Sequence, residues 1–262
     1  MELLCVGNAL IDGFAVVDEA FFDRFALHEP VQHLDYSRVE SILDAITDIS
    51  LYSGGGSATV AKVAARLGTP SSFVGAIGTK NQEPDTHGRL FMQELAFTGV
   101  KTFLSYKPVP TGICLILNTK SSGQSRIVAC PSAALQFMAR DIPQSLYHEA
   151  RLMVLDGYML GRTDFVHEVL AAARRRAMLL ALDTGSVANV ERYAQDIIRY
   201  CSEYRLILFM NEPESIAFCP DFSEAKREEF FTALSAQRAF PIIVVKLGDR
   251  GVYVCSGGVL ER

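Results

Sequence analysis

The chain has 262 residues, and 49% of them are hydrophobic, which is enough to bury a substantial core in one or two domains. The net charge of −5 and a pI of about 5.6 argue against a nucleic-acid partner, because nucleic-acid-binding domains are usually strongly basic. No basic segment precedes the first apolar run, and no stretch approaches the roughly 18 apolar residues of a membrane helix. We therefore expect a cytoplasmic protein with no membrane partner.

Cysteine and histidine spacing argues against the common metal and disulfide frameworks. No C-x-x-C pair occurs, and the histidines show no H-E-x-x-H or similar ligand spacing. Scattered cysteines are typical of small buried side chains in a reducing cytoplasm. The cysteines are at positions 5, 114, 130, 201, 219 and 255, and the histidines are at 28, 33, 87, 148 and 167.

The first fifty residues predict short strands and helices. Two apolar runs have the length of buried strands, and the polar residues Asn8 and Asp12 lie between them. Two later segments repeat apolar residues at helical spacing. The predicted strands are 3–6 and 14–17, and the predicted helices are 21–27 and 36–46.

A glycine loop followed directly by a helix is the most informative local pattern. Gly54, Gly55 and Gly56 lack Cβ atoms, so a ligand can approach their backbone closely. The first turn of the following helix, 57–67, would offer unpaired N–H groups and a positive dipole end to a polar or anionic ligand. The alternative is a tight turn whose glycines serve packing alone. The face predicted to be buried carries Ser57, Val60, Ala61, Ala64 and Leu67.

The middle of the chain predicts a small sheet added to the main body. A strand at 72–77, a polar mobile loop at 79–84 and a helix at 88–98 come first. Short β-rich pieces joined by turn residues then follow, a pattern typical of hairpins. The predicted strands are 102–106, 112–118 and 126–130, joined through Pro108, Pro110 and the turn Ser121–Gly123.

From Arg151 onward, strands and helices alternate, which predicts βαβ units with a parallel sheet. We expect one large α/β domain with a small sheet as a lid. The predicted strands are 152–155, 178–182, 206–210 and 242–245, and the predicted helices are 164–175, 190–201 and 223–237.

Polar residues follow each predicted buried strand. Ligands bind beyond the carboxyl ends of parallel strands, so these residues predict a site at one edge of the sheet, although each of them could instead cap a helix or form a turn. No P-loop sequence occurs, and Thr59 stands where a dinucleotide-binding loop has its third glycine. The residues concerned are Asn8, Asp156, Asp183, Asn211, Glu212, Gly248 and Asp249.

Several of these segments resemble the ribokinase, or PfkB, family of carbohydrate kinases, closest to its adenosine-kinase-like branch. The glycine loop with Ala61–Gly68 is similar to the family's first signature, and Asn211–Glu214 is similar to its N-x-x-E motif. Further similarities are Gly7–Asp12, Pro110–Gly112, Arg126 and Lys246–Gly248.

The resemblance implies a ribokinase-like three-layer α/β/α fold with a mainly parallel central sheet and a small β lid, formed by segments near 12–18 and 102–131. It also implies an ATP-dependent kinase that transfers the γ-phosphate to a hydroxyl of a sugar or nucleoside. The acceptor would be bound by Asn8, Asp12, Gly54, Gly55 and Thr59, and Arg126 would act on the transferred phosphate. The nucleotide would be bound by Asn211, Lys246 and Gly248. Glu214 would hold Mg²⁺ through water.

The sequence departs from the family pattern at three places. Thr59 replaces an asparagine, and the family's G-x-D-x-x-G appears as Gly78 followed by Asp85 and Gly88, with extra residues between them. The family's Gly-Ala-Gly-Asp motif, which carries the catalytic base, does not occur before Arg262. We therefore expect a C-terminally incomplete kinase. The alternatives are a catalytically dead relative that binds a sugar or nucleoside, and a homodimer formed through the lid.

Overall fold

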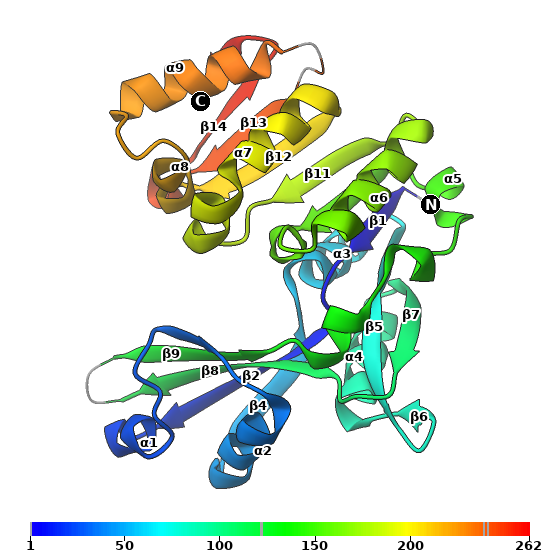
Figure 1. Ribbon diagram of the computed structural model, residues 1–262, viewed down its shortest axis with the longest axis vertical. Helices are drawn as coiled ribbons and strands as arrows, with labels where there is room; N and C mark the ends of the chain where they lie inside the picture. Colours follow the sequence, from blue (N-terminus) through cyan, green and yellow to red (C-terminus); the bar gives the residue numbers. More distant parts are fainter. Residues whose placement is uncertain (1, 121–122, 238, 240) are drawn as a thin grey trace. The chain divides into compact units, whose positions relative to one another are not determined.

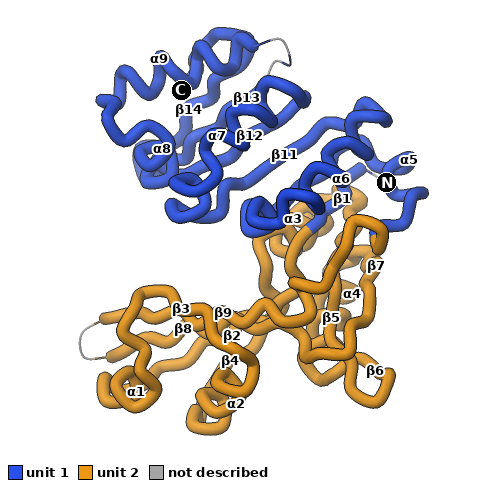
Figure 2. Tube along the Cα trace, viewed as in Figure 1, with its two compact units in different colours: residues 1–6, 142–262 blue, residues 7–141 orange. Residues whose placement is uncertain are grey.

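The computed structural model describes residues 2–120, 123–237, 239 and 241–262, and these residues form two compact units. Unit 1 comprises Met1–Val6 and Ile142–Arg262, and unit 2 comprises Gly7–Asp141 (Figure 2). Of the predicted turn Ser121–Gly123, Ser121 and Ser122 lie outside the described residues. The expectation of a single domain over the whole chain stays a prediction.

Unit 1 is built on a mainly parallel sheet (Figure 1). Its strands follow the order β15-β14-β13-β12-β11-β10-β1, with parallel pairing from β1 to β13 and antiparallel pairing at β14 and β15. The predicted βαβ pattern is therefore confirmed. The strands are β1 (Leu3–Val6), β10 (Leu152–Asp156), β11 (Leu179–Asp183), β12 (Leu206–Asn211), β13 (Ile242–Lys246), β14 (Val252–Ser256) and β15 (Val259–Glu261).

Two long helices of unit 1 begin at serine side-chain caps that the sequence provides. Ser186 accepts a hydrogen bond from the Asn189 N–H at the start of α7, and Ser223 caps α9 in the same way. The predicted helices 164–175, 190–201 and 223–237 are present with shifted ends. Helix α8 was not predicted, because it is too short to give a clear helical period. The helices are α5 (Leu146–Glu149), α6 (Thr163–Arg175), α7 (Val187–Glu203), α8 (Glu212–Phe218) and α9 (Glu224–Ser235), with short 3₁₀ turns at Gly157–Met159 and Gly248–Arg250.

In unit 2, the buried strand β5 (Ser71–Lys80) pairs in parallel with β7 (Lys101–Lys107). This pairing corrects the expectation that 102–106 belongs to the small sheet. The segment 79–84, predicted to be a loop, is instead part of a hairpin, because β6 (Glu83–Pro84) folds back on β5. Asn81 and Gln82 have φ values of 55° and 68°, the positive range that a tight two-residue hairpin turn requires.

A second sheet of unit 2, the lid sheet, has five strands in the order β3-β9-β8-β2-β4. β2 is twice as long as its predicted core of 14–17 and includes Asp12, and β4 was not predicted. Side chains of β2 alternate between a buried and a more exposed face, as expected for a sheet covered on one side. The strands are β2 (Leu10–Val17), β3 (Val31–His33), β4 (Ile49–Gly54), β8 (Gly112–Thr119) and β9 (Ser125–Cys130).

In the described part of unit 2, four α-helices accompany the sheets, together with 3₁₀ turns at Ser132–Gln136 and Ala139–Asp141. The predicted buried face of the glycine-loop helix is only partly right, because Val60 is 40% exposed and Leu67 is 80% exposed. The buried residues are the small Ser57, Ala58 and Ala61, which allow the helix to pack closely. The helices are α1 (Glu19–Arg24), α2 (Tyr36–Ala45), α3 (Gly56–Arg66) and α4 (Thr86–Phe97). Within the described residues, no helix combines the length and apolar character needed to cross a membrane.

Candidate functional site

Four of the predicted acceptor-binding residues meet at the start of α3. A Cβ atom placed on Gly54 would lie 2.1–2.3 Å from the carboxyl atoms of Asp12, so only glycine fits against this side chain. A Cβ atom on Gly55 would lie 2.2 Å from the Asn8 carbonyl oxygen, and Gly55 has a φ of 92°. The two glycines are therefore required by the Asp12 carboxyl group and the Asn8 backbone, which come from other parts of unit 2.

The N-terminus of α3 adds donors to this cluster. Gly55 occupies the cap position without a side-chain cap among the described residues, so the cap residue provides no side-chain acceptor for the first amides of the helix. The hydroxyl group of Ser57 is buried and has no hydrogen-bond partner in the described part of the chain. Thr59 is exposed on the same helix and lines a groove beside Lys62. This end of unit 2 can therefore accept a polar or hydroxyl-bearing ligand.

Asp12 lies on the lid sheet between Tyr52 of β4 and Cys114 of β8. Burial raises the pKa of its carboxyl group, and the positive charge of Lys62 opposes that shift. Burial and the nearby Asp12 charge together raise the pKa of the Cys114 thiol to about 12, so that thiol stays protonated at neutral pH. Lys62 is thus the positive group that helps to keep Asp12 ionised.

The residues similar to the G-x-D-x-x-G and Pro-Thr-Gly motifs form one hydrogen-bonded junction. Asp85 caps α4 by accepting from the Gly88 N–H at 2.7 Å, and its other oxygen accepts from the Thr111 N–H at 2.6 Å. The Thr111 hydroxyl donates to Asp85 and accepts from the Gly78 N–H at 2.8 Å. The extra residues of 79–84 form the hairpin described above and leave this junction intact.

Arg126 is not brought to Asp12. It lies opposite Leu117 on β8, whose side chain belongs to the buried face of the lid sheet, whereas Asp12 lies on the other face. The Arg126 guanidinium donates to the Leu27 carbonyl oxygen at 3.1 Å and stacks over Phe22 with its Cζ 5.2 Å from the ring centre. Arg126 and Asp12 therefore lie on different faces of the lid sheet, and a role of Arg126 at the transferred phosphate stays a prediction.

In unit 1, polar residues end four neighbouring parallel strands, as the sequence predicts. Asp156 lies opposite Asp183, and Asn211 lies opposite Lys246. The Lys246 ammonium is 3.2 Å from a carboxylate oxygen of Asp183, which links the ends of β13 and β11. Both side chains are about half exposed, so they remain accessible to a ligand at this edge.

Asn211 and Glu214 form a capping box at the start of α8. The Asn211 side chain accepts from the Glu214 N–H at 2.9 Å, and Glu214 accepts from the Asn211 backbone N–H at 2.8 Å. Glu214 also accepts from the Asn211 side-chain amide and from the buried Thr184 hydroxyl. Among the described residues, three of its four acceptor positions are filled, and one on Oε1 can accept from a water molecule. This is compatible with an indirect metal contact.

Gly248 begins the 3₁₀ turn between β13 and β14 and has a φ of 66°, with no described atom within 4 Å of a Cβ placed on it. Asp249 follows in the same turn. Within the described residues, no group of three His, Cys, Asp or Glu side chains is arranged to hold a metal ion directly.

Sequence reasoning missed Lys62, Ser53 and Glu94, which form a linked group beside Asp12 in unit 2. It also missed Thr184, the buried partner of Glu214. Lys62 gave only a weak signal, because a lysine one turn before Arg66 on the same helix is easily interpreted as solvent-facing. Ser53 and Glu94 gave no signal, because their contact joins positions 41 residues apart.

Comparisons with known proteins identify the family of the chain. The family model described as pfkB family carbohydrate kinase matches residues 15–261. Adenosine kinase 1 of Arabidopsis thaliana is 24% identical over 230 residues, which cover 82% of this chain and 64% of that protein. The chain therefore spans less than two thirds of the length of this curated relative.

Solved structures share the fold at low sequence identity. The adenosine kinase from Sinorhizobium meliloti has a TM-score of 0.84 at 19% identity, covering 100% of this chain and 79% of that chain. A probable sugar kinase from Rhizobium etli CFN 42 has a TM-score of 0.84 at 18% identity, covering 99% and 78%. The predicted ribokinase-like α/β fold is confirmed, and the chain belongs to the pfkB family of carbohydrate kinases.

Proposed function

We propose that the chain acts in ATP-dependent transfer of the γ-phosphate to a hydroxyl group of a sugar or nucleoside. Family membership supports a kinase of this class. The observation that carries the acceptor assignment is the contact between Asp12 and the glycine loop, where Gly54 leaves room only for the carboxyl group. A carboxylate can accept hydrogen bonds from the hydroxyls of a sugar ring, and backbone N–H groups at a helix N-terminus can donate to them.

In the proposed reaction, the acceptor oxygen bonds to the γ-phosphorus, the bond to the β-phosphate oxygen breaks, and the hydroxyl proton passes to a base. Catalysis of this kind depends on alignment and charge neutralisation. Asp12 orients the acceptor hydroxyls, and Asn8, Gly55 and Thr59 complete that side. In the family, the base belongs to a motif that does not occur in the 262 residues. The alternative is therefore a relative that binds a sugar or nucleoside without catalysis, and a turnover assay distinguishes the two.

On the nucleotide side, we propose that Asn211, Lys246 and Gly248 bind ATP at the carboxyl ends of β12 and β13. The half-exposed Lys246 ammonium can pair with a phosphate oxygen in place of Asp183. Bound Mg²⁺ would neutralise negative charge on the phosphates. Mg²⁺ keeps several of its waters in such sites, and the acceptor position of Glu214 Oε1 that no described residue fills suits contact through one of them. Arg126 is left out of this proposal because its guanidinium is engaged on the opposite face of the lid sheet.

An apolar surface beside Asp12 favours a nucleoside over a free sugar. Phe14 and Val16 follow Asp12 on the same face of β2 and are 44% and 56% exposed, and Tyr52 lies opposite Asp12. The rings of Phe14 and Tyr52 are 6.1 Å apart. A flat heterocyclic base would cover this surface, whereas a free sugar would leave it in water.

Binding of acceptors to the 262-residue chain tests the proposal. Isothermal titration calorimetry with adenosine, inosine, ribose and fructose should detect at least one acceptor. Asp12→Asn should weaken that acceptor about 10- to 100-fold, the range for loss of a hydrogen bond to a charged group. Asp44→Asn, which removes an exposed carboxylate on α2, is the matched control and should bind normally. Equal affinity of Asp12→Asn and the wild type, or no binding of any acceptor, would contradict the proposal.

A further inference from the structure

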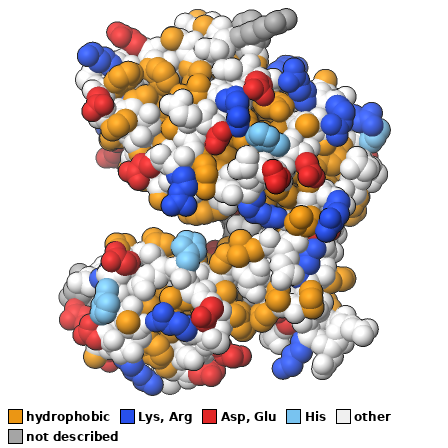
Figure 3. Space-filling model, in the orientation of Figure 1, with side chains coloured by type: hydrophobic (Ala, Val, Ile, Leu, Met, Phe, Trp, Pro, Cys, Tyr) orange, Lys and Arg blue, Asp and Glu red, His pale blue; other side chains and the backbone are white. Residues whose placement is uncertain are grey.

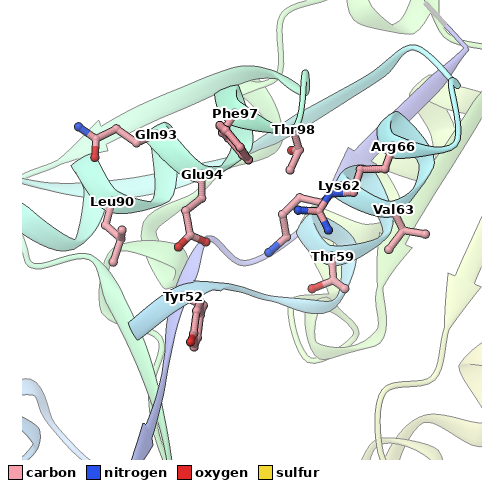
Figure 4. A pocket seen from close by; sticks show the side chains of 10 residues that line it. All are labelled: Tyr52, Thr59, Lys62, Val63, Arg66, Leu90, Gln93, Glu94, Phe97 and Thr98. Atoms are coloured by element: carbon pink, nitrogen blue, oxygen red, sulfur yellow. The ribbon is translucent and has the colours of Figure 1, made fainter. Parts of the chain in front are cut away.

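A groove of about 700 Å³ lies between α3, α4 and the end of β4 in unit 2. Figure 4 shows Lys62 of α3 and Glu94 of α4 pointing toward one another across it. Arg66 lies one turn further along α3 and lines the same groove. The other lining residues are Tyr52, Thr59, Val63, Leu90, Gln93, Phe97 and Thr98.

Ser53 joins the two charged side chains. Lys62 Nζ donates to the Ser53 carbonyl oxygen at 2.6 Å and lies 2.8 Å from its hydroxyl oxygen. Glu94 Oε2 accepts from the Ser53 N–H and from the Ser53 hydroxyl, both at 2.7 Å. Both backbone polar groups and the hydroxyl of one buried residue are therefore held by charged side chains of two helices.

Ser53 directly precedes Gly54, whose backbone packs against the Asp12 carboxyl group. Any shift of the Ser53–Gly54 segment would change the space that Asp12 occupies. Lys62 also acts on Asp12 through charge, since its positive charge opposes the effect of burial on the pKa of Asp12, and Asp12 in turn acts on Lys62. One lysine thus influences both the backbone beside the carboxylate and the charge around it.

We propose that Lys62 is a positioning residue of the acceptor site, which holds Gly54 against Asp12 through Ser53 and supplies the positive charge that Asp12 faces. The proposal deepens the proposed function and rests on it for the statement that Asp12 binds the acceptor. Glu94 fixes Ser53 from the other side of the groove, so the two helices that form the groove are coupled to the acceptor carboxylate.

The test uses Lys62→Met, with Arg66→Met as the matched control. Both variants remove one positive charge from the same groove, but only Lys62 contacts Ser53. The first measurement is an NMR titration of the Asp12 carboxyl carbon in the free protein. Lys62→Met should raise the pKa of Asp12 above its wild-type position, Arg66→Met should leave it unchanged, and Lys62→Arg should restore it. A role limited to helix packing would not move this pKa.

The second measurement is acceptor affinity by calorimetry. Lys62→Met should lower the affinity for the acceptor about tenfold, which is the effect of losing one charge-assisted contact. Glu94→Gln keeps Lys62 and tests the link through Ser53, so it should lower the affinity for the acceptor as well. This variant provides the test if Lys62→Met does not fold. An unchanged pKa of Asp12 in folded Lys62→Met, or unchanged affinity in both variants, would overturn the proposal. If the pKa moves but the wild type binds no acceptor, the proposed function fails while the coupling of Lys62 to Asp12 stands.

Discussion

Asp12 is held in an environment that opposes its charge. Its carboxyl group is part-buried against Gly54, and burial raises its pKa despite the nearby Lys62. A carboxylate kept in such a place costs folding stability when it is ionised. Side chains whose pKa is shifted by burial are enriched at functional sites, where they contribute to binding rather than to folding stability.

The stability of an Asp12→Asn variant should show this cost as a function of pH. The folded-state pKa of Asp12 lies above its ordinary value of 3.8, so the native state holds this proton more tightly than the unfolded chain does. The stability contribution of this proton is fully present below pH 3.8 and is lost as pH rises through the raised pKa.

The melting temperature of Asp12→Asn should therefore exceed that of the wild type by a margin that widens from acid to neutral pH. Differential scanning calorimetry over this range measures the margin. Asp44→Asn should show no such widening. A margin that narrows as pH rises would show that burial is not the dominant influence on Asp12.

At the scale of elements, the start of α4 is coupled to β5 and to the segment before β8. Asp85 caps the helix and binds both the backbone and hydroxyl of Thr111, which is fully buried. Gly78 leaves no room for a side chain at this point, because a Cβ atom would lie 2.2 Å from the Thr111 nitrogen. One carboxylate therefore fixes the end of β5, the entry to β8 and a helix N-terminus.

Asp85→Ala should accordingly cost more stability than the loss of an ordinary cap. Loss of the cap costs about 0.5–2 kcal/mol, and leaving buried Thr111 groups unpaired adds about 1–3 kcal/mol. Urea denaturation gives the free energy of unfolding. Asp35→Ala removes the exposed cap of α2, whose hydrogen bonds within the described structure go to Ser37 and Arg38 of its own helix, and should cost less. Similar losses in the two variants would mean that the junction with Thr111 contributes nothing.

At the scale of the whole molecule, the net charge is −5. Both basic and acidic side chains are present on the face shown in Figure 3. The densest basic run, Arg174 to Arg176, lies at the end of α6, where cations meet the negative end of the helix dipole. Arg174 also lies over the ring of Tyr204, with its Cζ 5.7 Å from the ring centre.

We therefore expect no binding of DNA or RNA, even at about 50 mM salt, where phosphate contacts are strongest. Fluorescence polarisation with labelled duplex and single-stranded oligonucleotides measures this. Binding that disappears in a variant with glutamine at positions 174–176 would show that the run is a functional basic patch. A homodimer through the lid stays a separate prediction, which light scattering on the same sample tests.

The sequence alone determined the fold class and identified Asn8, Asp12, Gly54 and Gly55, which meet at the start of α3. Apolar runs of strand length alternating with helical periods predict parallel βαβ units, because these periods follow from backbone geometry. The glycine loop, Asn8 and Asp12 could be identified because each is an unusual residue type at a strand end or a helix start. The ends of β10 to β13 carry the predicted polar residues for the same reason.

Only the tertiary structure decided which side chains face one another. The strand period does not say which face of the lid sheet is covered, so Arg126 and Asp12 could not be separated before the register was known. β7 pairs with β5 because strand neighbours are chosen by packing across the chain. The contact of Glu94 with Ser53 joins positions 41 residues apart, and such contacts depend on how helices pack, which local sequence patterns do not encode.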